Sequence, residues 1–263
     1  MSRPKIISVA NQKGGVGKTT TAINLGASLA VRGKSVVVID LDPQGNASTG
    51  LGIPRETRMK TAYDLLLSQD SVDDIARETG VENLHIVPAT MDLSSADAEL
   101  MSTARRVVHL RNALHLRAST YDYILIDCPP SLNLLTINAF VASDTVLVPL
   151  QAEFFALEGL SQLLLTVREV RATANADLRL EGIVLTMFDK RNNLCQQVEE
   201  DARANLGDLV FRTRIPRNVR LSEAPSYAMP VMNYDPTSRG ALAYKALASE
   251  LLERHLTEEP ENA

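Results

Sequence analysis

Short apolar runs rich in β-branched residues alternate with segments of helical periodicity along this chain of 263 residues. Continuous apolar runs of this length are typical of strands buried on both faces, as in a parallel sheet. The expected strands are Ile6–Ala10, Val36–Ile39, Leu84–Val87, Tyr123–Ile126, Thr145–Val148 and Ile183–Met187. The expected helices are Thr19–Val31, Ser94–Arg117, Leu132–Val141, Leu157–Ala174, Leu194–Leu206 and Ser238–Leu256.

This alternation predicts the fold class: one doubly wound α/β domain over residues 1–263, with a mostly parallel sheet and helices on both faces. The acidic tail 257–263 is expected to fray. Hydrophobic residues make up 45% of the chain and charged residues 22%, which argues against intrinsic disorder.

The composition also excludes several classes of protein. The two cysteines, Cys128 and Cys195, are too few for a disulfide scaffold or for a four-cysteine metal site in one chain. No apolar run approaches the ~18 residues of a membrane span, and no signal-peptide core follows Met1. We therefore expect a cytoplasmic protein without a membrane partner.

A glycine-rich loop, Asn11-Gln-Lys-Gly-Gly-Val-Gly-Lys-Thr-Thr20, follows the first expected strand and opens the first expected helix. This is the context of a P-loop, whose glycines let backbone N–H groups face phosphate oxygens. Gln12 stands where the general motif has glycine, so the loop is a variant, but Gly, Lys and Thr at the right offsets disfavour an ordinary turn. We expect Lys18 to reach the β- and γ-phosphates and the Thr19 hydroxyl to bind Mg²⁺. The residues expected to hold the nucleotide are Lys13, Gly14, Gly15, Val16, Gly17, Lys18, Thr19 and Thr20.

Aspartates follow two of the expected strands, at the edge where ligands of open α/β sheets bind. Asp40 and Asp42 follow one strand, and Asp127 follows another. An aspartate at the end of a buried strand is typical of a Walker B site, where it faces Mg²⁺ or its water shell, and we predict this role for Asp127. For Asp40 and Asp42, an Asx turn that ends the strand before Pro43 is an alternative interpretation.

The second lysine, Lys13, makes the loop resemble the deviant Walker A motif of the ParA/MinD group of P-loop ATPases. Further segments are similar to the chromosomal, Soj-like branch of ParA proteins, so the resemblance covers nearly the whole chain. These segments are Asp40–Asn46, Asp127–Pro130, Pro149–Gly159, Leu185–Asp189 and Ile215–Pro225.

The resemblance implies an ATPase that uses ATP and Mg²⁺ and forms a sandwich homodimer with ATP. Lys13 would reach the nucleotide of the partner subunit, and Asp42 would orient the attacking water, with Asp40 near the magnesium ion. Lys13, Lys18 and Asp42 would thus form the catalytic set. Pro216 and Asn218 would line the adenine pocket, although the same residues also suit a loop turn.

The formal charge of −5 argues against a protein that is basic overall, as many dedicated DNA-binding proteins are. The segment from residue 190 to residue 220 nevertheless carries +3, so the rest of the chain carries −8. A run of arginines also suits a solvated face, and no recognition helix indicates base readout. By resemblance, Arg191 and Arg220 match arginines that bind non-specific double-stranded DNA. Lys190, Arg212 and Arg217 are further candidates.

The resemblance also implies chromosome or plasmid segregation, a nucleoid location and a ParB-type centromere-binding partner that stimulates hydrolysis. The P-loop begins near the N-terminus, so we expect no helix-turn-helix domain before it. A MinD-like membrane ATPase is the main competing interpretation. It needs a basic amphipathic C-terminal helix, whereas residues 238–263 carry −2 and Leu242, Leu247, Leu251 and Leu252 suggest a core-facing stripe.

Two more classes of protein share the P-loop. An iron–sulfur reductase subunit would need two suitably placed cysteines, and Cys128 and Cys195 do not resemble that arrangement. A nucleotide-gated adaptor that does not hydrolyse ATP differs only in turnover, which a sequence does not reveal.

Overall fold

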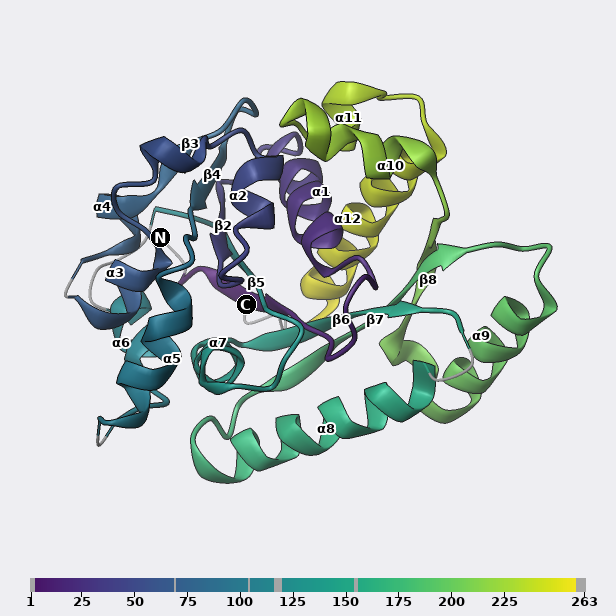
Figure 1. Ribbon diagram of the computed structural model, residues 1–263. Coiled ribbons are helices and arrows are strands. Elements are labelled where there is room, and N and C mark those ends of the chain that lie inside the picture. The colour runs from purple at the N-terminus through teal and green to yellow at the C-terminus, as the bar shows by residue number, and fades with distance from the viewer. Residues whose placement is uncertain (1–2, 69, 104, 116–119, 154–155, 259–263) are drawn as a thin grey trace, which may run out of the picture.

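One eight-stranded sheet runs through the computed structural model, which describes residues 3–68, 70–103, 105–115, 120–153 and 156–258 (Figure 1). Its strand order is β3-β4-β2-β5-β1-β6-β7-β8, and all neighbours are parallel except the short edge strand β3, which is antiparallel to β4. The strands are β1 (Lys5–Val9), β2 (Val36–Asp40), β3 (Arg77–Glu78), β4 (Leu84–Val87), β5 (Tyr123–Asp127), β6 (Thr145–Gln151), β7 (Arg179–Phe188) and β8 (Val210–Pro216). The predicted doubly wound α/β class is confirmed.

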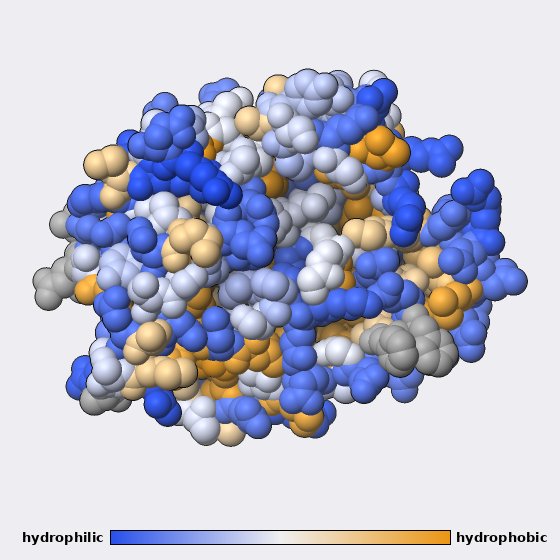
Figure 2. All heavy atoms as spheres, viewed as in Figure 1, coloured by the Kyte–Doolittle hydropathy of each residue, from blue (hydrophilic) through white to orange (hydrophobic). Residues whose placement is uncertain are grey.

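Helices cover both faces of this sheet (Figure 1). The first face carries α1 (Lys18–Ala30), α2 (Asn46–Gly50), α10 (Val219–Glu223), α11 (Val231–Tyr234) and α12 (Arg239–Glu258). The second face carries α3 (Ala62–Leu67), α4 (Val72–Ile75), α5 (Leu93–Met101), α6 (His109–His115), α7 (Leu134–Ala142), α8 (Ala156–Thr173) and α9 (Asn193–Leu206). Short 3₁₀ turns span Arg55–Thr57, Gly207–Leu209 and Ala224–Tyr227. The outer surface seen in the same view is largely hydrophilic (Figure 2).

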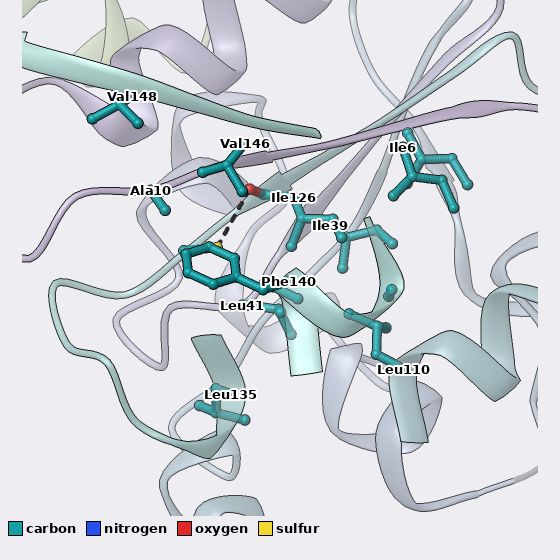
Figure 3. Packing of buried hydrophobic residues seen from close by; sticks show 14 of the residues in the cluster. Ile6, Ala10, Ile39, Leu41, Leu110, Ile126, Leu135, Phe140, Val146 and Val148 are labelled. Carbon is teal, nitrogen blue, oxygen red and sulfur yellow. Dashed lines mark hydrogen bonds between the residues drawn. The ribbon is translucent and has the colours of Figure 1, made fainter. Parts of the chain in front are cut away.

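The central strands are buried on both faces because side chains alternate across a strand. Along β5, Ile124 and Ile126 join the core of the second face, whereas Tyr123 and Leu125 join the core of the first. In Figure 3, Phe140 of α7 points toward the strand residues of the second face. This double burial explains why the central strands appear in the sequence as continuous apolar runs.

The expected helix Ser94–Arg117 is wrong as a single element. Helix α5 ends at Met101 and α6 begins at His109, while residues 116–119 lie outside the described residues. Two hydroxyl groups explain the break, because Ser102 Oγ donates to the Glu99 carbonyl at 2.6 Å and Thr103 Oγ1 donates to the Leu100 carbonyl at 3.0 Å. Such local bonds compete with the next helical turn.

The last helix, α12, differs from its expected core-facing stripe at one position. Leu247 and Leu251 are fully buried and Leu252 is partly buried against the core, but Leu242 is 54% exposed. The helix continues through Glu258, and residues 259–263 of the expected tail lie outside the described residues. No described helix is both long enough and apolar enough to cross a membrane.

Glu181 of β7 is a buried acid at the end of the sheet away from the glycine-rich loop. It accepts hydrogen bonds from Thr145 Oγ1 at 2.6 Å and from His255 Nε2 of α12 at 2.9 Å. Burial alone would raise the pKa of Glu181, but the hydrogen bonds and charge of His255, together with Thr145, outweigh it and lower the pKa below its ordinary value. This network fastens the end of α12 to the sheet.

Replacement of His255 by alanine is expected to lower the free energy of unfolding by about 3 kcal/mol, because it removes the His255 hydrogen bond from a buried carboxylate. Leu256→Ala, at an exposed neighbour, is the control and should cost less than about 0.5 kcal/mol. Urea denaturation at pH 7 measures both. The contribution of Glu181 is present above its ordinary pKa of 4.5 and is lost as the pH falls below it, because the unfolded state then binds more protons. A wild-type-like His255→Ala curve would contradict this role.

Candidate nucleotide site and basic groove

The glycine-rich loop lies between the end of β1 and the start of α1, as predicted. Gly17 is the residue before the helix, and its φ of 91° lies in the left-handed region, which favours glycine. The loop is held from two sides: Asn11 Nδ2 donates to the Pro149 carbonyl at 2.8 Å, and Thr186 Oγ1 of β7 donates to the Val16 carbonyl at 2.8 Å. The N-terminus of α1 therefore opens into a fixed loop that suits an anion.

Lys18 is the first residue of α1 and is only 7% exposed. Its Nζ donates to the Lys13 carbonyl at 2.9 Å, across the loop. Burial lowers the pKa of Lys18, and the negative charge of Asp127 is the main effect that opposes this shift. A cation held with little water around it interacts strongly with a phosphate.

Asp127 ends β5 directly beside Asp40, which ends β2, and both are fully buried. Neither carboxylate oxygen of Asp127 meets the geometry of a hydrogen bond to another described residue, although Thr19 is near enough to lower its pKa. Burial and the charge of Asp40 still raise the pKa of Asp127 well above its usual range. An orphaned buried carboxylate beside a threonine is a suitable ligand pair for a cation that keeps most of its other ligands from water and phosphate, as Mg²⁺ does.

Asp40 is placed differently from Asp127, because both of its oxygens accept hydrogen bonds. Oδ2 accepts from the N–H and the Oγ of Ser48 at 2.8 and 2.6 Å, and Oδ1 accepts from the N–H of Asp42 at 3.2 Å. Burial raises the pKa of Asp40 to about 6. Its hydrogen bonds fasten α2 to the end of β2. Among the described residues, no group of three His, Cys, Asp or Glu side chains could hold a metal ion.

Asp42 lies in a tight turn that leads into α2. Its Oδ1 accepts from the N–H of Gln44 at 3.0 Å, and its backbone carbonyl accepts from the N–H of Gly45 at 2.9 Å. From the sequence, an Asx turn is the alternative to a functional aspartate, and the structure contains that turn. The turn fixes Oδ1 of the carboxylate and leaves Oδ2 out of these bonds.

A pocket of about 570 Å³ adjoins the glycine-rich loop. The two residues predicted for a base-binding wall, Pro216 and Asn218, both line it. Asn218 also accepts a hydrogen bond from the N–H of Arg220 at 3.0 Å, which caps the start of α10. The remaining lining residues are Gly17, Thr20, Thr186, Met187, Ile215, Arg217, Val219, Leu221, Ser222, Pro225 and Tyr244.

Lys13 is exposed on the outer side of the loop, where it forms an ion pair with Glu153 of the same chain. No motif in the sequence indicates Glu153 as its partner. Residues 154–155, which follow within the segment Pro149–Gly159, lie outside the described residues.

A second hollow of about 790 Å³ adjoins the pocket at Pro216 and Arg217, and most of its charged lining residues are basic. Three of the predicted DNA-binding residues, Lys190, Arg191 and Arg217, line it together with Arg214 and Arg239. In Figure 2, hydrophilic residues gather on this side, at the right of the view. We call this set of five residues the basic groove. Arg239 comes from α12, and the charge count along residues 190–220 could not have included it.

The other two predicted arginines do not line the basic groove. Arg220 forms ion pairs with Glu223 at 2.8 Å and Asp235 at 3.3 Å. Arg212 pairs with two acids of α12, Glu250 and Glu253, at 3.5 and 2.9 Å. Arg212 thus connects β8 to α12, and Arg220 on α10 shares its charge with two acids.

The loop between β1 and α1, the buried lysine and the aspartate on the neighbouring strand define a P-loop nucleotide-binding site. The sequence profile of the AAA domain family matches residues 4–180. The chain is 56% identical over 247 residues to the sporulation initiation inhibitor protein Soj of Bacillus subtilis, covering 94% of this chain and 98% of that protein. It is 55% identical over 252 residues to the chromosome partitioning protein ParA of Caulobacter vibrioides, covering 95% and 94%. The chain therefore belongs to the ParA/Soj family of chromosome-partitioning ATPases.

Solved structures agree with this assignment. Cobyrinic acid a,c-diamide synthase from Mycobacterium smegmatis, crystallised with ADP and magnesium, is 36% identical and superposes with a TM-score of 0.83, covering 97% of this chain and 96% of that one. The predicted resemblance and the predicted P-loop fold are confirmed.

Proposed function

We propose that the protein binds ATP and Mg²⁺ at the P-loop, dimerises around ATP, binds double-stranded DNA non-specifically through the basic groove, and releases it after hydrolysis. The observation that carries the proposal is that Pro216 and Arg217 line both the nucleotide pocket and the basic groove. The nucleotide and the DNA would thus bind on two sides of the segment that contains Pro216 and Arg217. The relatives named for chromosome partitioning, and the neighbour that contains ADP and magnesium, support the same proposal.

Different residues of the chain would hold the phosphates, the metal and the attacking water. Backbone N–H groups of the glycine-rich loop and the Lys18 ammonium would hold the phosphates, and Thr19 and Asp127 would hold Mg²⁺. The metal supplies charge neutralisation on the phosphate oxygens when bound. Asp42, fixed by its turn, would orient the attacking water. Lys13 would leave Glu153 and engage the nucleotide of the partner subunit, where a cation stabilises developing charge.

The basic groove gives DNA affinity without sequence readout, because phosphate contacts carry no base information. The chain as a whole carries −5, so one groove offers modest affinity. A dimer presents two grooves and gains avidity from both. ATP would therefore control DNA binding by controlling dimerisation. A ParB-type protein at centromere-like sites would stimulate hydrolysis, and the protein would reside on the nucleoid in the cytoplasm.

Two measurements on the wild-type protein test the proposal. ATPase activity and double-stranded DNA binding are measured with ATP, with ADP and without nucleotide, across a salt series. We expect hydrolysis and DNA binding that requires ATP and weakens steeply with salt. DNA binding that is equal in all nucleotide states, or ATP-dependent sedimentation with anionic vesicles in place of DNA binding, would overturn it.

Charge reversal in the basic groove is expected to weaken DNA binding without affecting the nucleotide site. Arg191 is a highly exposed candidate, with 91% of its side chain exposed, and it forms an ion pair with the nearby Asp189. Arg191→Glu should weaken DNA binding at least about tenfold and reduce the salt slope of the dimer by about two, one for each subunit. Electrophoretic mobility shifts across a salt series measure both.

Arg171→Glu on α8 is the matched control for this prediction. It makes the same charge change at an exposed arginine outside the basic groove, and it should leave DNA affinity within about twofold. Equal losses in the two variants would show that the groove itself contributes nothing beyond net charge.

A further inference from the structure

Arg58 is a buried arginine behind the turn that carries Asp42. It follows the 3₁₀ turn Arg55–Thr57 and is only 7% exposed. Its guanidinium donates to the Ile53 carbonyl at 2.7 and 3.1 Å, to the Ala89 carbonyl at 3.0 Å and to Thr49 Oγ1 at 2.9 Å. A longer bond of 3.4 Å reaches the Gly45 carbonyl. Among the described residues, no ion pair connects this guanidinium to a carboxylate.

A buried cation whose hydrogen-bond partners are all uncharged lowers the stability of the fold compared with an apolar side chain of similar size. Burying a charge is unfavourable unless hydrogen bonds compensate for the lost water. Arginine spreads five N–H donors over a planar fork, whereas lysine offers three donors from a single nitrogen and an apolar side chain offers none. Arg58 uses this property to join segments that are not neighbours in the sequence, since residue 89 follows β4 and residue 45 precedes α2.

Gly45 connects the guanidinium of Arg58 to the backbone of Asp42. Gly45 accepts from Arg58 through its carbonyl and donates its N–H to the carbonyl of Asp42 at 2.9 Å. Gly45 has a φ of 65°, and a Cβ added to it would lie 2.4 Å from Arg58 Nη1. The guanidinium is therefore packed against the last residue of the turn, and the turn has no room to shift toward it.

A second set of bonds holds the same segment from its other side. Ser48 Oγ donates to Asp40 at 2.6 Å and accepts from the N–H of Ala89 at 2.9 Å. Ala89 thus contacts Ser48 through its N–H and Arg58 through its carbonyl. Residues 42–50 are held between β2 on one side and the segment after β4 on the other.

We infer that Arg58 is a positioning residue for ATP hydrolysis: it fixes residues 42–50 so that the Asp42 carboxylate keeps the orientation needed to align the attacking water. The inference rests on the proposed ATPase function. It predicts an effect on turnover rather than on ATP affinity, because Arg58 contacts neither the glycine-rich loop nor the nucleotide pocket. A displacement of about 1 Å in a catalytic group can cost a hundredfold in rate.

The test compares Arg58→Met and Arg58→Lys with Arg55→Met, which removes an exposed arginine three residues away. We expect Arg58→Met to lower kcat at least about tenfold, with KM and the Kd for ATP within about threefold of wild type. Arg58→Lys keeps the charge but not the fork, so its kcat should lie between the two, and Arg55→Met should match wild type. Steady-state phosphate release and titration with a fluorescent ATP analogue give these values.

Thr49→Val provides a second test if Arg58→Met does not fold. It removes one acceptor of the guanidinium at an exposed position of α2, and we expect kcat to fall about threefold with an unchanged Tm. A kcat within twofold of wild type in folded Arg58→Met or in Thr49→Val would overturn the inference. If KM and kcat changed together with the fraction of folded protein, Arg58 would be a structural residue only. Absence of hydrolysis in the wild-type protein would instead overturn the proposed function.

Discussion

Replacing Lys18 by alanine is expected to weaken ATP binding at least about a hundredfold. Lys18 Nζ lies inside the glycine-rich loop, on a side chain that is 7% exposed, so its charge is poorly screened by water. A phosphate in the loop would lose the Lys18 ammonium as a counter-charge, together with a charge-assisted hydrogen bond. That loss is about 3 kcal/mol, which corresponds to roughly two orders of magnitude in Kd. Isothermal titration with ATP and Mg²⁺ measures it.

Lys60→Ala is the matched control for this prediction, because Lys60 is exposed and pairs with Asp70 away from the loop. Its affinity for ATP should equal that of the wild type. Thermal denaturation without nucleotide shows whether Lys18→Ala is folded. A folded Lys18→Ala protein that binds ATP within threefold of wild type would show that the loop does not hold the phosphates.

The sequence predicts the centre of the fold better than its edges. The central strands are flanked by other strands and covered on both faces, so their continuous apolar runs stand out. Strand β8 is an edge strand, and its exposed positions carry Arg212 and Arg214 between buried residues. That alternation is typical of an edge but does not resemble the other strands. Strand β3 has only two residues, both exposed, and no sequence pattern could have indicated it.

The site shows the same division between local motifs and distant contacts. Lys18, Thr19 and Asp127 are predictable, because each belongs to a short motif next to a strand. Thr186 and Arg58 are not predictable, because their hydrogen bonds join residues far apart in the sequence: Thr186 bonds to Val16, and Arg58 bonds to Ala89.

The basic groove illustrates the limit of charge counting along the chain. The count selects a stretch of sequence, but only the structure shows which of its basic residues line one hollow. Arg212 forms ion pairs with Glu250 and Glu253 and does not line the groove. Arg239, which lies outside the segment 190–220, does line it.

Replacing Asp42 by alanine is expected to lower ATP hydrolysis at least about a hundredfold while ATP and DNA affinity stay within about threefold. Asp42 is 8% exposed, and one of its oxygens is fixed by the N–H of Gln44. Loss of a group that positions the attacking water reduces turnover by about two to four orders of magnitude, but it removes no contact with the bound phosphates. The variant should therefore accumulate in the ATP-bound, DNA-bound state. Phosphate release and mobility shifts at saturating ATP measure the two properties separately.

Asp42→Asn separates the charge of Asp42 from its turn. The amide oxygen can still accept from Gln44, so the turn before α2 is kept, whereas the negative charge is lost. If the carboxylate acts on water, Asp42→Asn should be as slow as Asp42→Ala. If the turn alone matters, Asp42→Asn should hydrolyse ATP at the wild-type rate, and the proposed catalytic role of Asp42 would be wrong. A slow Asp42→Asn with a preserved turn would also support the inference on Arg58, because it would show that the geometry held by Arg58 serves a carboxylate that takes part in hydrolysis.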